Sequence, residues 1–590
     1  MEIDNLYRLR HSLAHVLAIA VLEEFPEAKL AIGPPVDNGF YYDFELPCAL
    51  QPEDLPALQE RMKKILPQGL GFAESTHSIN EALERFKDQP YKAELIRDLA
   101  EKGETEVTFY TSGDFVDLCK GGHVESTAEI PVDCFALSHA SGAYWRGDEK
   151  RPMLQRIYGL AFETADELKA YQTMMEEAKK RDHRKLGAEL DLFTFSDLVG
   201  SGLPLWTPKG TILRNLLDDY VGELRANYDY QKVEIPHITK RDLYEKSGHW
   251  EKFQEELFRI KTREGHEFVM KPMNCPHHTQ IFDRRKWSYR EMPARYANTT
   301  MCYRDEQSGE LSGLSRTRAF SQDDAHVFCR YDQSKEEQLK VWEIIETFYK
   351  SFGFELSMRL SFHDPSNMGA YLGTEEEWQQ AENELKELMV EKGVEYEIGI
   401  GEAAFYGPKI DFMAKDSIGR KWQVATLQVD KNQPSRFGLT YTAEDGSEQP
   451  VLMIHAAIMG SIDRFLSVFI EHVAGNFPFW LSPVQVSVLP VNDQCFESAR
   501  ELATLLKKEG LRVTVDESSE SVGKKIRNAS VQKTPVKLVL GLKEIEAFKE
   551  SGVWKVKPNW RTDLAELGEE EIALDQLLSS MRELVATKKF

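Results

Sequence analysis

The amino-acid sequence predicts a multidomain protein of mixed α/β and α+β class. Its 590 residues suggest roughly three or four domains, and a hydrophobic content of 42% suffices for several cores. The stretch from Met301 to Cys329 alternates apolar and charged residues around a glycine-rich turn, which predicts a long antiparallel hairpin. After Leu481, helix and strand patterns alternate, which predicts a mainly parallel sheet at the C-terminal end.

The N-terminal segment brings together residue types that bind metals. His11 and His15 lie four residues apart in the helical pattern RLRHSLAHVLAIAVLEEF and so share one helix face. Cys119 and His123 flank a glycine-rich bend in VDLCKGGHV. This quartet has the donor types and the number of a tetrahedral zinc site, but a metal-free catalytic pocket or ordinary polar packing fits the pattern equally well.

Two helical patterns follow. Residues 168–187 (LKAYQTMMEEAKKRDHRKLG) predict a charged amphipathic helix that connects domains. The stretch GTILRNLLDDYVGELRANYDYQKVEIPHI predicts a long amphipathic helix and then a strand that stops at Pro236.

Composition restricts the compartment and the partners. The sequence has no apolar run of eighteen residues and no apolar segment near Met1, so neither a membrane nor secretion is indicated. Seven scattered cysteines suit a reducing cytoplasm. A net charge of −24 opposes nucleic-acid binding by the whole chain, yet residues 523–561 contain 10 basic against 3 acidic residues. A local basic face therefore remains available.

The hairpin itself carries charges that suit a nucleotide. Arg304 and Glu306 lie on one side of the turn and Arg316 on the other. Planar guanidinium groups bind phosphate oxygens in bidentate fashion, and a carboxylate beside them can accept a hydrogen bond from a base amino group. Taken alone, the segment could equally be a solvated charged hairpin.

The segment RDEQSGELSGLSRTRAFSQDDAHVFC resembles motif 2 of the class II aminoacyl-tRNA synthetases and closely matches their threonyl-tRNA synthetase family. The resemblance continues through KPMNCPHH, GEAAFYGPKIDF, WQVATLQVD and IHAAIMGSIDRF, and it covers nearly the whole chain. It implies a bacterial-type enzyme that joins L-threonine to threonine tRNA through a threonyl adenylate. It also implies a homodimer through motif 1, in the helix and strand that end at Pro236.

Attack of a carboxylate on the α-phosphate of ATP needs fixed positive charge more than acid–base catalysis. By resemblance, Arg304 holds the α-phosphate, Glu306 the adenine amino group and Arg316 the γ-phosphate, with Mg²⁺ bound to the ATP. Phe320 would stack on adenine and Gln423 would complete the nucleotide site. Arg464 matches the motif 3 arginine, and Arg304 and Arg464 are the expected catalytic pair.

Threonine and valine have nearly the same shape, so apolar contacts separate them by only about a hundredfold. A zinc ion with an open position can bind both the amino and the hydroxyl group of threonine. The family motifs imply one zinc per chain, held by Cys275, His326 and His455. They also imply a threonine pocket made by Gln322, Asp324, Tyr406 and Gln428.

Serine keeps the hydroxyl, and the missing methyl is worth only about 1 to 3 kcal/mol, so a second site is needed. HSLAH and DLCKGGH resemble the domain that hydrolyses mischarged Ser-tRNA, where the pocket generally works without metal. The resemblance implies the editing residues His11, His15, Tyr42, Lys92, Asp117, Cys119 and His123. Gly122 departs from the family, which usually has proline there.

The expected domains are residues 1–160 for editing, 161–185 as a helical linker, 186–480 for class II catalysis on an antiparallel sheet, and 481–590 for the anticodon. In the last, Lys524, Lys525 and Arg527 are expected to contact tRNA phosphates. Lys557 lies where the family usually has an arginine. HSLAH begins ten residues after Met1, so the ubiquitin-like domain that normally precedes the bacterial editing domain is expected to be absent.

Two rival functions stay open. One is a synthetase-like paralogue that makes the adenylate but charges tRNA weakly. The other is a non-catalytic tRNA-binding protein that keeps only the fold, although Arg304, Arg316, Arg464 and the zinc-type trio would then have no use.

Overall fold

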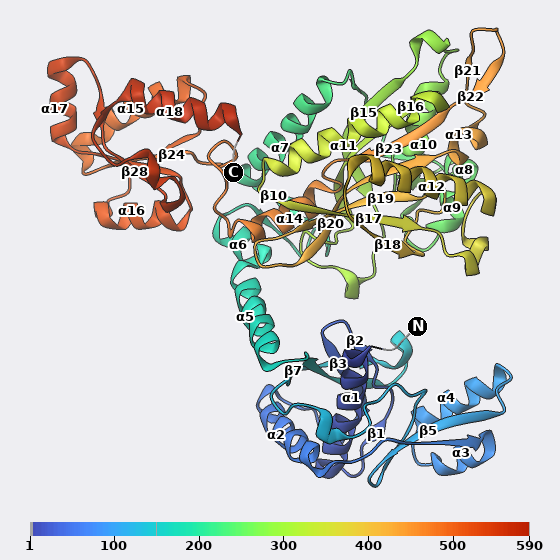
Figure 1. The fold of residues 1–590 in the computed structure, drawn as a ribbon. Helices are drawn as coiled ribbons and strands as arrows, with labels where there is room; N and C mark the ends of the chain where they lie inside the picture. The colour runs from blue at the N-terminus through green and yellow to red at the C-terminus, as the bar shows by residue number, and fades with distance from the viewer. Residues whose placement is uncertain (1–3, 149, 589–590) are drawn as a thin grey trace. The chain divides into compact units, whose positions relative to one another are not determined.

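The computed structural model describes residues 4–148 and 150–588. The chain divides into two compact units, Met1–Glu176 and Glu177–Phe590 (Figure 1). None of the helices within those described ranges is both long enough and apolar enough to cross a bilayer.

The first unit is built around helix α1 (Asn5–Glu24), which begins where the Asp4 carboxylate accepts the backbone N–H of Tyr7. One side of α1 packs on an antiparallel sheet with the order β1-β3-β8-β7, and β2 pairs with β3. A second antiparallel sheet has the order β4-β5-β6. The bounds are β1 Lys29–Leu30, β2 Pro35–Val36, β3 Gly39–Glu45, α2 Leu55–Ile65, β4 Ala73–Ser78, α3 Ile79–Arg85, α4 Pro90–Glu101, β5 Glu106–Ser112, β6 Phe115–Leu118, β7 Phe135–Tyr144 and β8 Met153–Ala161.

The predicted connecting helix over residues 168–187 is broken into two. Helix α5 (Ala165–Arg181) ends one residue before Asp182, whose side chain caps the start of helix α6 (His183–Glu189) by accepting the N–H of Arg184. A short acidic side chain at this position satisfies a free N–H of a new helix, which favours a break there. The prediction of one continuous helix was therefore wrong.

An eight-stranded, largely antiparallel sheet dominates the second unit. Its order is β11-β15-β16-β23-β20-β19-β17-β18, and only the outermost pairs, β11 with β15 and β17 with β18, are parallel. The predicted hairpin forms the second and third strands of this order, β15 and β16. The bounds are β11 Gln231–Lys232, β15 Ala294–Tyr303, β16 Ala319–Cys329, β17 Glu355–Phe362, β18 Tyr396–Ile400, β19 Lys409–Lys415, β20 Lys421–Asp430 and β23 Leu452–Ala457.

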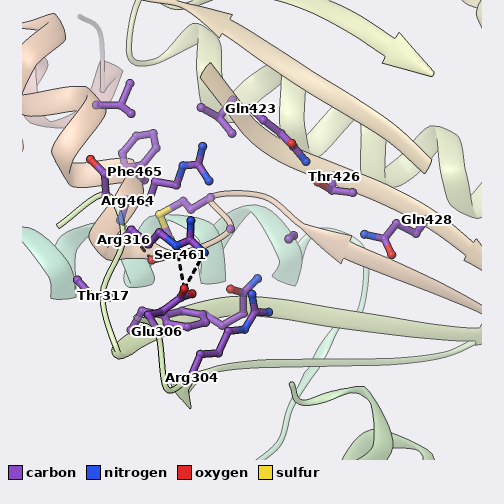
Figure 2. A pocket seen from close by; sticks show the side chains of 18 residues that line it. Arg304, Glu306, Arg316, Thr317, Gln423, Thr426, Gln428, Ser461, Arg464 and Phe465 are labelled. Atoms are coloured by element: carbon purple, nitrogen blue, oxygen red, sulfur yellow. Dashed lines mark hydrogen bonds and ion pairs between the residues drawn. The ribbon is translucent and has the colours of Figure 1, made fainter. Parts of the chain in front are cut away.

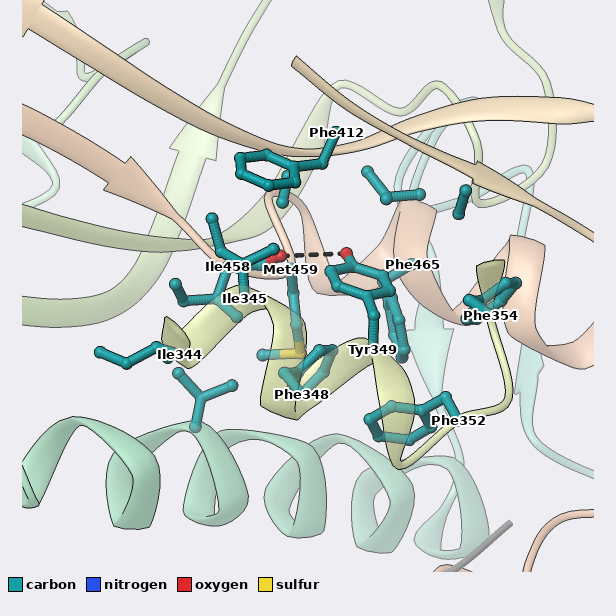
Figure 3. Packing of buried hydrophobic residues seen from close by; sticks show 14 of the residues in the cluster. Ile344, Ile345, Phe348, Tyr349, Phe352, Phe354, Phe412, Ile458, Met459 and Phe465 are labelled. Carbon is teal, nitrogen blue, oxygen red and sulfur yellow. Dashed lines mark hydrogen bonds between the residues drawn. The ribbon is translucent and has the colours of Figure 1, made fainter. Parts of the chain in front are cut away.

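Helix α11 (Ser334–Lys350) covers one face of this sheet and lies between the sheet and helix α7 (Pro208–Ala226), as Figure 3 shows. Phe348, Tyr349 and Phe352 fill the space towards helix α14 (Ile462–His472). The buried Tyr349 hydroxyl donates to the Ile458 carbonyl at 2.9 Å, so this polar group does not lose its hydrogen bond on burial. The opposite face of the sheet is thereby left free for a site.

The C-terminal part has the predicted alternating α/β arrangement. Strands β25, β24 and β26 are parallel neighbours, and β28 closes the sheet in the antiparallel direction. The bounds are β24 Val486–Pro490, α15 Phe496–Lys508, β25 Val513–Val515, α16 Val522–Val531, β26 Val536–Leu540, α17 Leu542–Ser551, β28 Pro558–Trp560 and α18 Leu574–Thr587.

Candidate functional site

Strand register places polar side chains from four strands in one row across the large sheet. His326 on β16 stands opposite His455 on β23, which stands opposite Gln428 on β20, and Gln428 in turn stands opposite Lys409 on β19. Residues directly opposite one another in a sheet project from the same face. Residues separated by up to 129 positions therefore meet on the open face of the sheet.

Cys275 completes this row as the first residue of helix α10 (Cys275–Asp283). Its Sγ and one ring nitrogen each from His326 and His455 all lie within 4.8 Å of one another. Nε2 of His326 is 3.0 Å from Nδ1 of His455. Ligands about 2.0 to 2.3 Å from a tetrahedral Zn²⁺ have similar separations, so the three donors fit such an ion.

The outer nitrogens of both rings are already held. Nε2 of His455 lies 3.0 Å from a carboxylate oxygen of Asp430, and Nδ1 of His326 lies 2.8 Å from Nδ1 of His278. Such partners fix the ring orientation and leave the inner nitrogens to face the site. Burial raises the pKa of the Cys275 thiol well above its ordinary value, so a thiolate here requires a positive charge beside it.

A cavity of about 160 Å³ opens beside this trio. All four predicted threonine-binding residues line it, namely Gln322, Asp324, Tyr406 and Gln428. The Tyr406 hydroxyl donates to Gln428 at 2.6 Å, and Asn274 donates to Asp324 at 3.1 Å. The pocket thus presents a carboxylate and amide groups next to the three metal-type donors.

A larger cavity of about 440 Å³ adjoins the first and shares Arg304, Gln322 and Gln428 with it. The predicted nucleotide-binding residues all line this cavity: Arg304, Glu306, Arg316, Phe320, Gln423 and Arg464. Figure 2 shows Arg304 and Glu306 across the opening from Arg464, with Gln423, Thr426 and Gln428 along β20. The volume is typical of small-molecule sites.

A β-bulge brings Gln423 to this face. Pairing between β19 and β20 joins Phe412 to Ala425 but Met413 to Gln423, so Val424 is the extra residue. Without it, strict alternation from Gln428 and Thr426 would turn Gln423 to the other face. The Gln423 amide instead donates to the buried Asp411 carboxylate at 2.8 Å.

Arg316 and Glu306 are paired with each other in this structure. Nη2 of Arg316 lies 2.7 Å from Glu306 (Figure 2). The same atom lies 3.0 Å from Glu310. The pKa of Arg464 is lowered by loss of hydration between the pocket walls and then by the charge of Arg316. Two guanidinium groups facing one cavity mark it as an anion site.

In the first unit, the predicted editing residues also gather. The Cys119 sulfur lies 3.4 Å from Nε2 of His11 and 3.3 Å from Nε2 of His123. The buried Asp117 carboxylate accepts the Tyr42 hydroxyl at 2.7 Å, pairs with Lys92, and lies 3.5 Å from Nε2 of His15.

Burial sets the charge state of this pocket. It lowers the pKa of His123 to about 2 and raises that of Cys119 to about 11. At neutral pH the imidazoles are therefore uncharged and the thiol is protonated. A protonated thiol is a poor nucleophile, and an imidazole whose pKa lies far below neutral is a weak base, so burial does not favour covalent attack by Cys119.

The bend after Cys119 is specific to this chain. Gly121 and Gly122 have φ values of 92° and 90°. Proline is locked near −65°, so the residue that the family usually carries at Gly122 could not adopt this conformation. The Gly121 N–H donates to the Cys119 sulfur at 3.3 Å, which ties the bend to the pocket.

The predicted tRNA-contacting cations do not all lie at the surface. Lys524, Arg527 and Lys557 are exposed. Lys525 is 1% exposed, and its ammonium donates to the carbonyls of Pro490 and Asp516 at 3.0 and 2.9 Å. The predicted phosphate contact by Lys525 is therefore wrong, because its buried ammonium group binds two backbone carbonyls inside the domain.

Sequence reasoning missed two residues of the site, His249 and Asp411. His249 is fully buried, with Nε2 3.5 Å from the Cys275 sulfur. Asp411 accepts hydrogen bonds from five side chains: Arg359, Ser361, Lys409, Gln423 and Thr426. A histidine between Gly248 and Trp250 was the sequence signal available for His249. Asp411 could be found only from the register of β19 with its neighbouring strands.

Three family models match the chain. The tRNA synthetase class II core domain (G, H, P, S and T) matches residues 258–473, and the anticodon binding domain matches residues 485–584. The threonyl and alanyl tRNA synthetase second additional domain matches residues 107–158. The fold class predicted from the sequence is thereby confirmed.

Curated relatives and solved structures agree with these matches. Threonine–tRNA ligase of Gloeobacter violaceus is 48% identical over 551 residues, 92% of this chain and 87% of that protein. The Thermus thermophilus enzyme of that name is 48% identical over 560 residues, 92% of this chain and 84% of that protein.

Among solved structures, the RNA binding domain of threonyl-tRNA synthetase from Cryptosporidium parvum matches with a TM-score of 0.64 and 36% identity, over 68% of this chain and 98% of that one. A putative threonyl-tRNA synthetase from Aeropyrum pernix matches with a TM-score of 0.59 and 29% identity, over 70% and 97%. The two threonine–tRNA ligases are 48% identical to this chain over 92% of its length. The chain therefore belongs to the threonine–tRNA ligase family of class II aminoacyl-tRNA synthetases.

Proposed function

We propose that the chain activates L-threonine with ATP, transfers it to threonine tRNA, and hydrolyses mischarged Ser-tRNA in its first unit. The observation that carries the proposal is the row of His326, His455 and Gln428, which joins a metal-type trio to a cavity lined by arginines. A paralogue without efficient charging is not favoured, since the relatives named threonine–tRNA ligase cover 92% of the chain.

In the activation step, the threonine carboxylate attacks the α-phosphorus, the bond to the β-phosphate breaks, and pyrophosphate leaves. Arg304 and Arg464 would neutralise the charge that develops on the α-phosphate, and Arg316 would exchange its pairing with Glu306 for the γ-phosphate. Glu306 would then accept from the adenine amino group, Phe320 would stack on the base, and Gln423 would line its pocket. Mg²⁺ would enter with the phosphates.

Cys275, His326 and His455 would hold one Zn²⁺, which supplies a Lewis acid for the amino and hydroxyl groups of threonine. Asp324 would accept hydrogen bonds from the same groups, with Gln322, Tyr406 and Gln428 closing the pocket. Valine offers no hydroxyl and would leave these buried polar groups unpaired, which is the basis of its rejection.

The proposed division of labour is residues 1–160 for editing, 161–185 as linker, 186–480 for catalysis and 481–590 for the anticodon. For editing we propose His11, His15, Tyr42, Lys92, Asp117, Cys119 and His123, and for tRNA phosphates Lys524, Arg527 and Lys557. We also propose a homodimer in a reducing cytoplasm. All seven cysteines are free thiols, which supports a reducing compartment.

Three measurements on one preparation test the proposal. Threonine-dependent exchange of pyrophosphate into ATP reports activation, charging of threonine tRNA reports transfer, and release of serine from Ser-tRNA reports editing. Exchange without charging would support the paralogue, and charging without serine release would remove the editing role.

A further inference from the structure

His183 joins three parts of the second unit that are far apart in the sequence. It begins helix α6, is 4% exposed, and contacts both helix α14 and the loop between β15 and β16. We call residues 304–318 the nucleotide loop, because they carry Arg304, Glu306 and Arg316.

Hydrogen bonds define which nitrogen of the ring carries the proton. The backbone N–H of Leu314, in the nucleotide loop, donates to Nε2 of His183 at 3.0 Å. A backbone N–H can only donate, so Nε2 bears the lone pair and the proton is on Nδ1. Nδ1 donates to Oε1 of Glu471 on α14 at 2.7 Å, and the backbone N–H of His183 donates to the same oxygen at 3.0 Å.

The loop is shaped to approach this imidazole closely. Gly313 has a φ of 50°, and a Cβ at this position would lie 2.2 Å from Nε2 of His183. Leu314 is 1% exposed and belongs to the main core of the unit. The next residue, Ser315, bonds to Ser467 on α14 at 2.9 Å between hydroxyl oxygens. Arg316 is the next residue in the chain, so its backbone is held by the contact of Leu314 with His183 and by the contact of Ser315 with Ser467.

The same helix carries the opposing arginine. Arg464, Ser467 and Glu471 are spaced three and four residues apart, which places them on one face of α14. Arg464 faces the cavity, while Ser467 and Glu471 hold the nucleotide loop. The other Glu471 oxygen is fixed by Arg420 at 2.6 Å.

A metal site at Asp182, His183 and Glu471 is a competing explanation for this cluster. Both carboxylates are already paired with guanidinium groups, Asp182 with Arg184 and Glu471 with Arg420. Both ring nitrogens of His183 are also engaged, one by Glu471 and one by Leu314. These charges and contacts leave no ligand set for a cation.

We propose that His183 is a positioning residue for nucleotide binding: by tying Leu314 to Glu471 it fixes the spacing between Arg316 and Arg464. The proposal rests on the proposed function of these two arginines as phosphate ligands. Binding of a polyphosphate by two guanidinium groups depends on their separation, and a free loop would have to be ordered when ATP binds.

Two substitutions separate the contacts of His183. In His183→Gln, the amide oxygen reaches the place of Nε2 and can accept from Leu314, while the bond to Glu471 is lost. In His183→Asn, the amide nitrogen takes the place of Nδ1 and can donate to Glu471, while nothing reaches Leu314. We expect His183→Asn to raise the KM for ATP in threonine-dependent exchange about five- to tenfold, the effect of one lost hydrogen bond to an ordered loop. His183→Gln should stay near the wild-type value, and the KM for threonine should not change in either.

His363 provides a matched control. Its backbone N–H and its Nδ1 also meet one oxygen of a glutamate, Glu382, at 3.1 and 2.6 Å. Within the described part of the chain its Nε2 has no hydrogen-bond partner. His363→Asn keeps the bond to Glu382 in the way that His183→Asn keeps the bond to Glu471, and it should leave the KM for ATP unchanged.

Gly313→Ala disturbs the contact between Leu314 and His183 from the side of the nucleotide loop. It tests the same proposal if the histidine variants fold poorly. Its added methyl group must move Leu314 away from His183 and should reproduce the higher KM for ATP. Equal KM values for ATP in His183→Asn, His183→Gln and wild type would overturn the positioning role. Absence of threonine-dependent exchange in the wild-type protein would instead overturn the proposed function itself.

Discussion

His326 and His455 stand directly opposite each other on β16 and β23, with Nε2 of the first 3.0 Å from Nδ1 of the second. Two ring nitrogens this close repel each other when both carry lone pairs, unless a proton or a cation lies between them. Asp430 and His278 occupy the outer nitrogens, so both inner nitrogens face the Cys275 sulfur. A divalent cation satisfies all three donors at once.

We therefore expect Cys275→Ala to lose the metal. The purified protein should contain about one zinc per chain, and the variant should contain almost none, because two imidazoles alone are a weak zinc site. Elemental analysis after gel filtration measures this. Cys302→Ala, a buried cysteine in the same cavity that is outside the trio, is the control and should keep its zinc. Full zinc content in Cys275→Ala would show that the donors are assigned wrongly.

Asp430→Asn should weaken zinc binding about 10- to 100-fold without abolishing it, since the carboxylate orients the His455 ring and increases its basicity. Competition with a chelator of known affinity measures the change. Gln433 also donates to this carboxylate, at 2.9 Å, so a thermal unfolding curve of the variant is needed to separate a loss of zinc affinity from a loss of stability. An unchanged zinc affinity would mean that this carboxylate serves packing alone.

His11→Ala and His15→Ala should abolish serine release from Ser-tRNA while leaving threonine charging intact. The quartet lies in the first compact unit and the two cavities in the second, so separate defects are expected. Steady-state deacylation and charging assays measure the two activities. His77→Ala is the control, because His77 belongs to the same unit but its ring bonds to Ser75, outside the quartet. Serine release at the wild-type rate in the double variant would rule out the editing role.

Arg316→Ala should lower kcat/KM for ATP about 10- to 100-fold, the size of a lost charge-assisted hydrogen bond to a phosphate. The KM for threonine should not change, because Arg316 lines only the larger cavity. Threonine-dependent exchange measures both. Arg290→Ala, an exposed arginine outside both cavities, should behave like the wild type. A parallel rise in both KM values would argue for a general disturbance of the site.

Glu337 and Arg295 form a buried bidentate ion pair between α11 and β15, with distances of 2.6 and 2.7 Å. Burial alone would raise the pKa of Glu337, but the hydrogen bonds from Arg295 and Lys340 outweigh it and the pKa is lowered. The pair thus stabilises the fold above the ordinary pKa of 4.5, and this stability is lost as the pH falls through the lower folded-state value.

Glu337→Gln should accordingly reduce the free energy of unfolding by about 3 kcal/mol at pH 7, because Arg295 is left buried without its counter-ion. The difference from the wild type should shrink as the pH falls below 4.5, because the carboxylate of the unfolded chain is protonated first, and it should be lost as the pH falls through the lower folded-state pKa. Denaturant titrations across this pH range measure both effects. Glu336→Gln, the exposed neighbour that also pairs with Lys340, should change stability by less than about 1 kcal/mol. Equal losses in the two variants would contradict the argument.

Local patterns predicted much of this protein. Helical spacing placed His11 and His15 on one face, and turn residues around Gly309 and Gly313 predicted the hairpin of β15 and β16. The family resemblance was confirmed, and it supplied the trio Cys275, His326 and His455, whose separations carry no local metal pattern. What remained hidden depends on long-range contacts. His249 lies beside Cys275, and Lys525 is buried although Lys524 and Arg527 on the same helix are exposed.

The row that crosses β16, β23, β20 and β19 links folding to activity. A shift of β23 by one residue would turn His455 to the opposite face and bring Ala456 or Ile454 into the row. The same shift would separate Gln428 from the trio, so no partly correct sheet could keep half of the site. The pocket therefore forms completely or not at all, and binding of zinc and threonine would require the correct register of β16, β23 and β20.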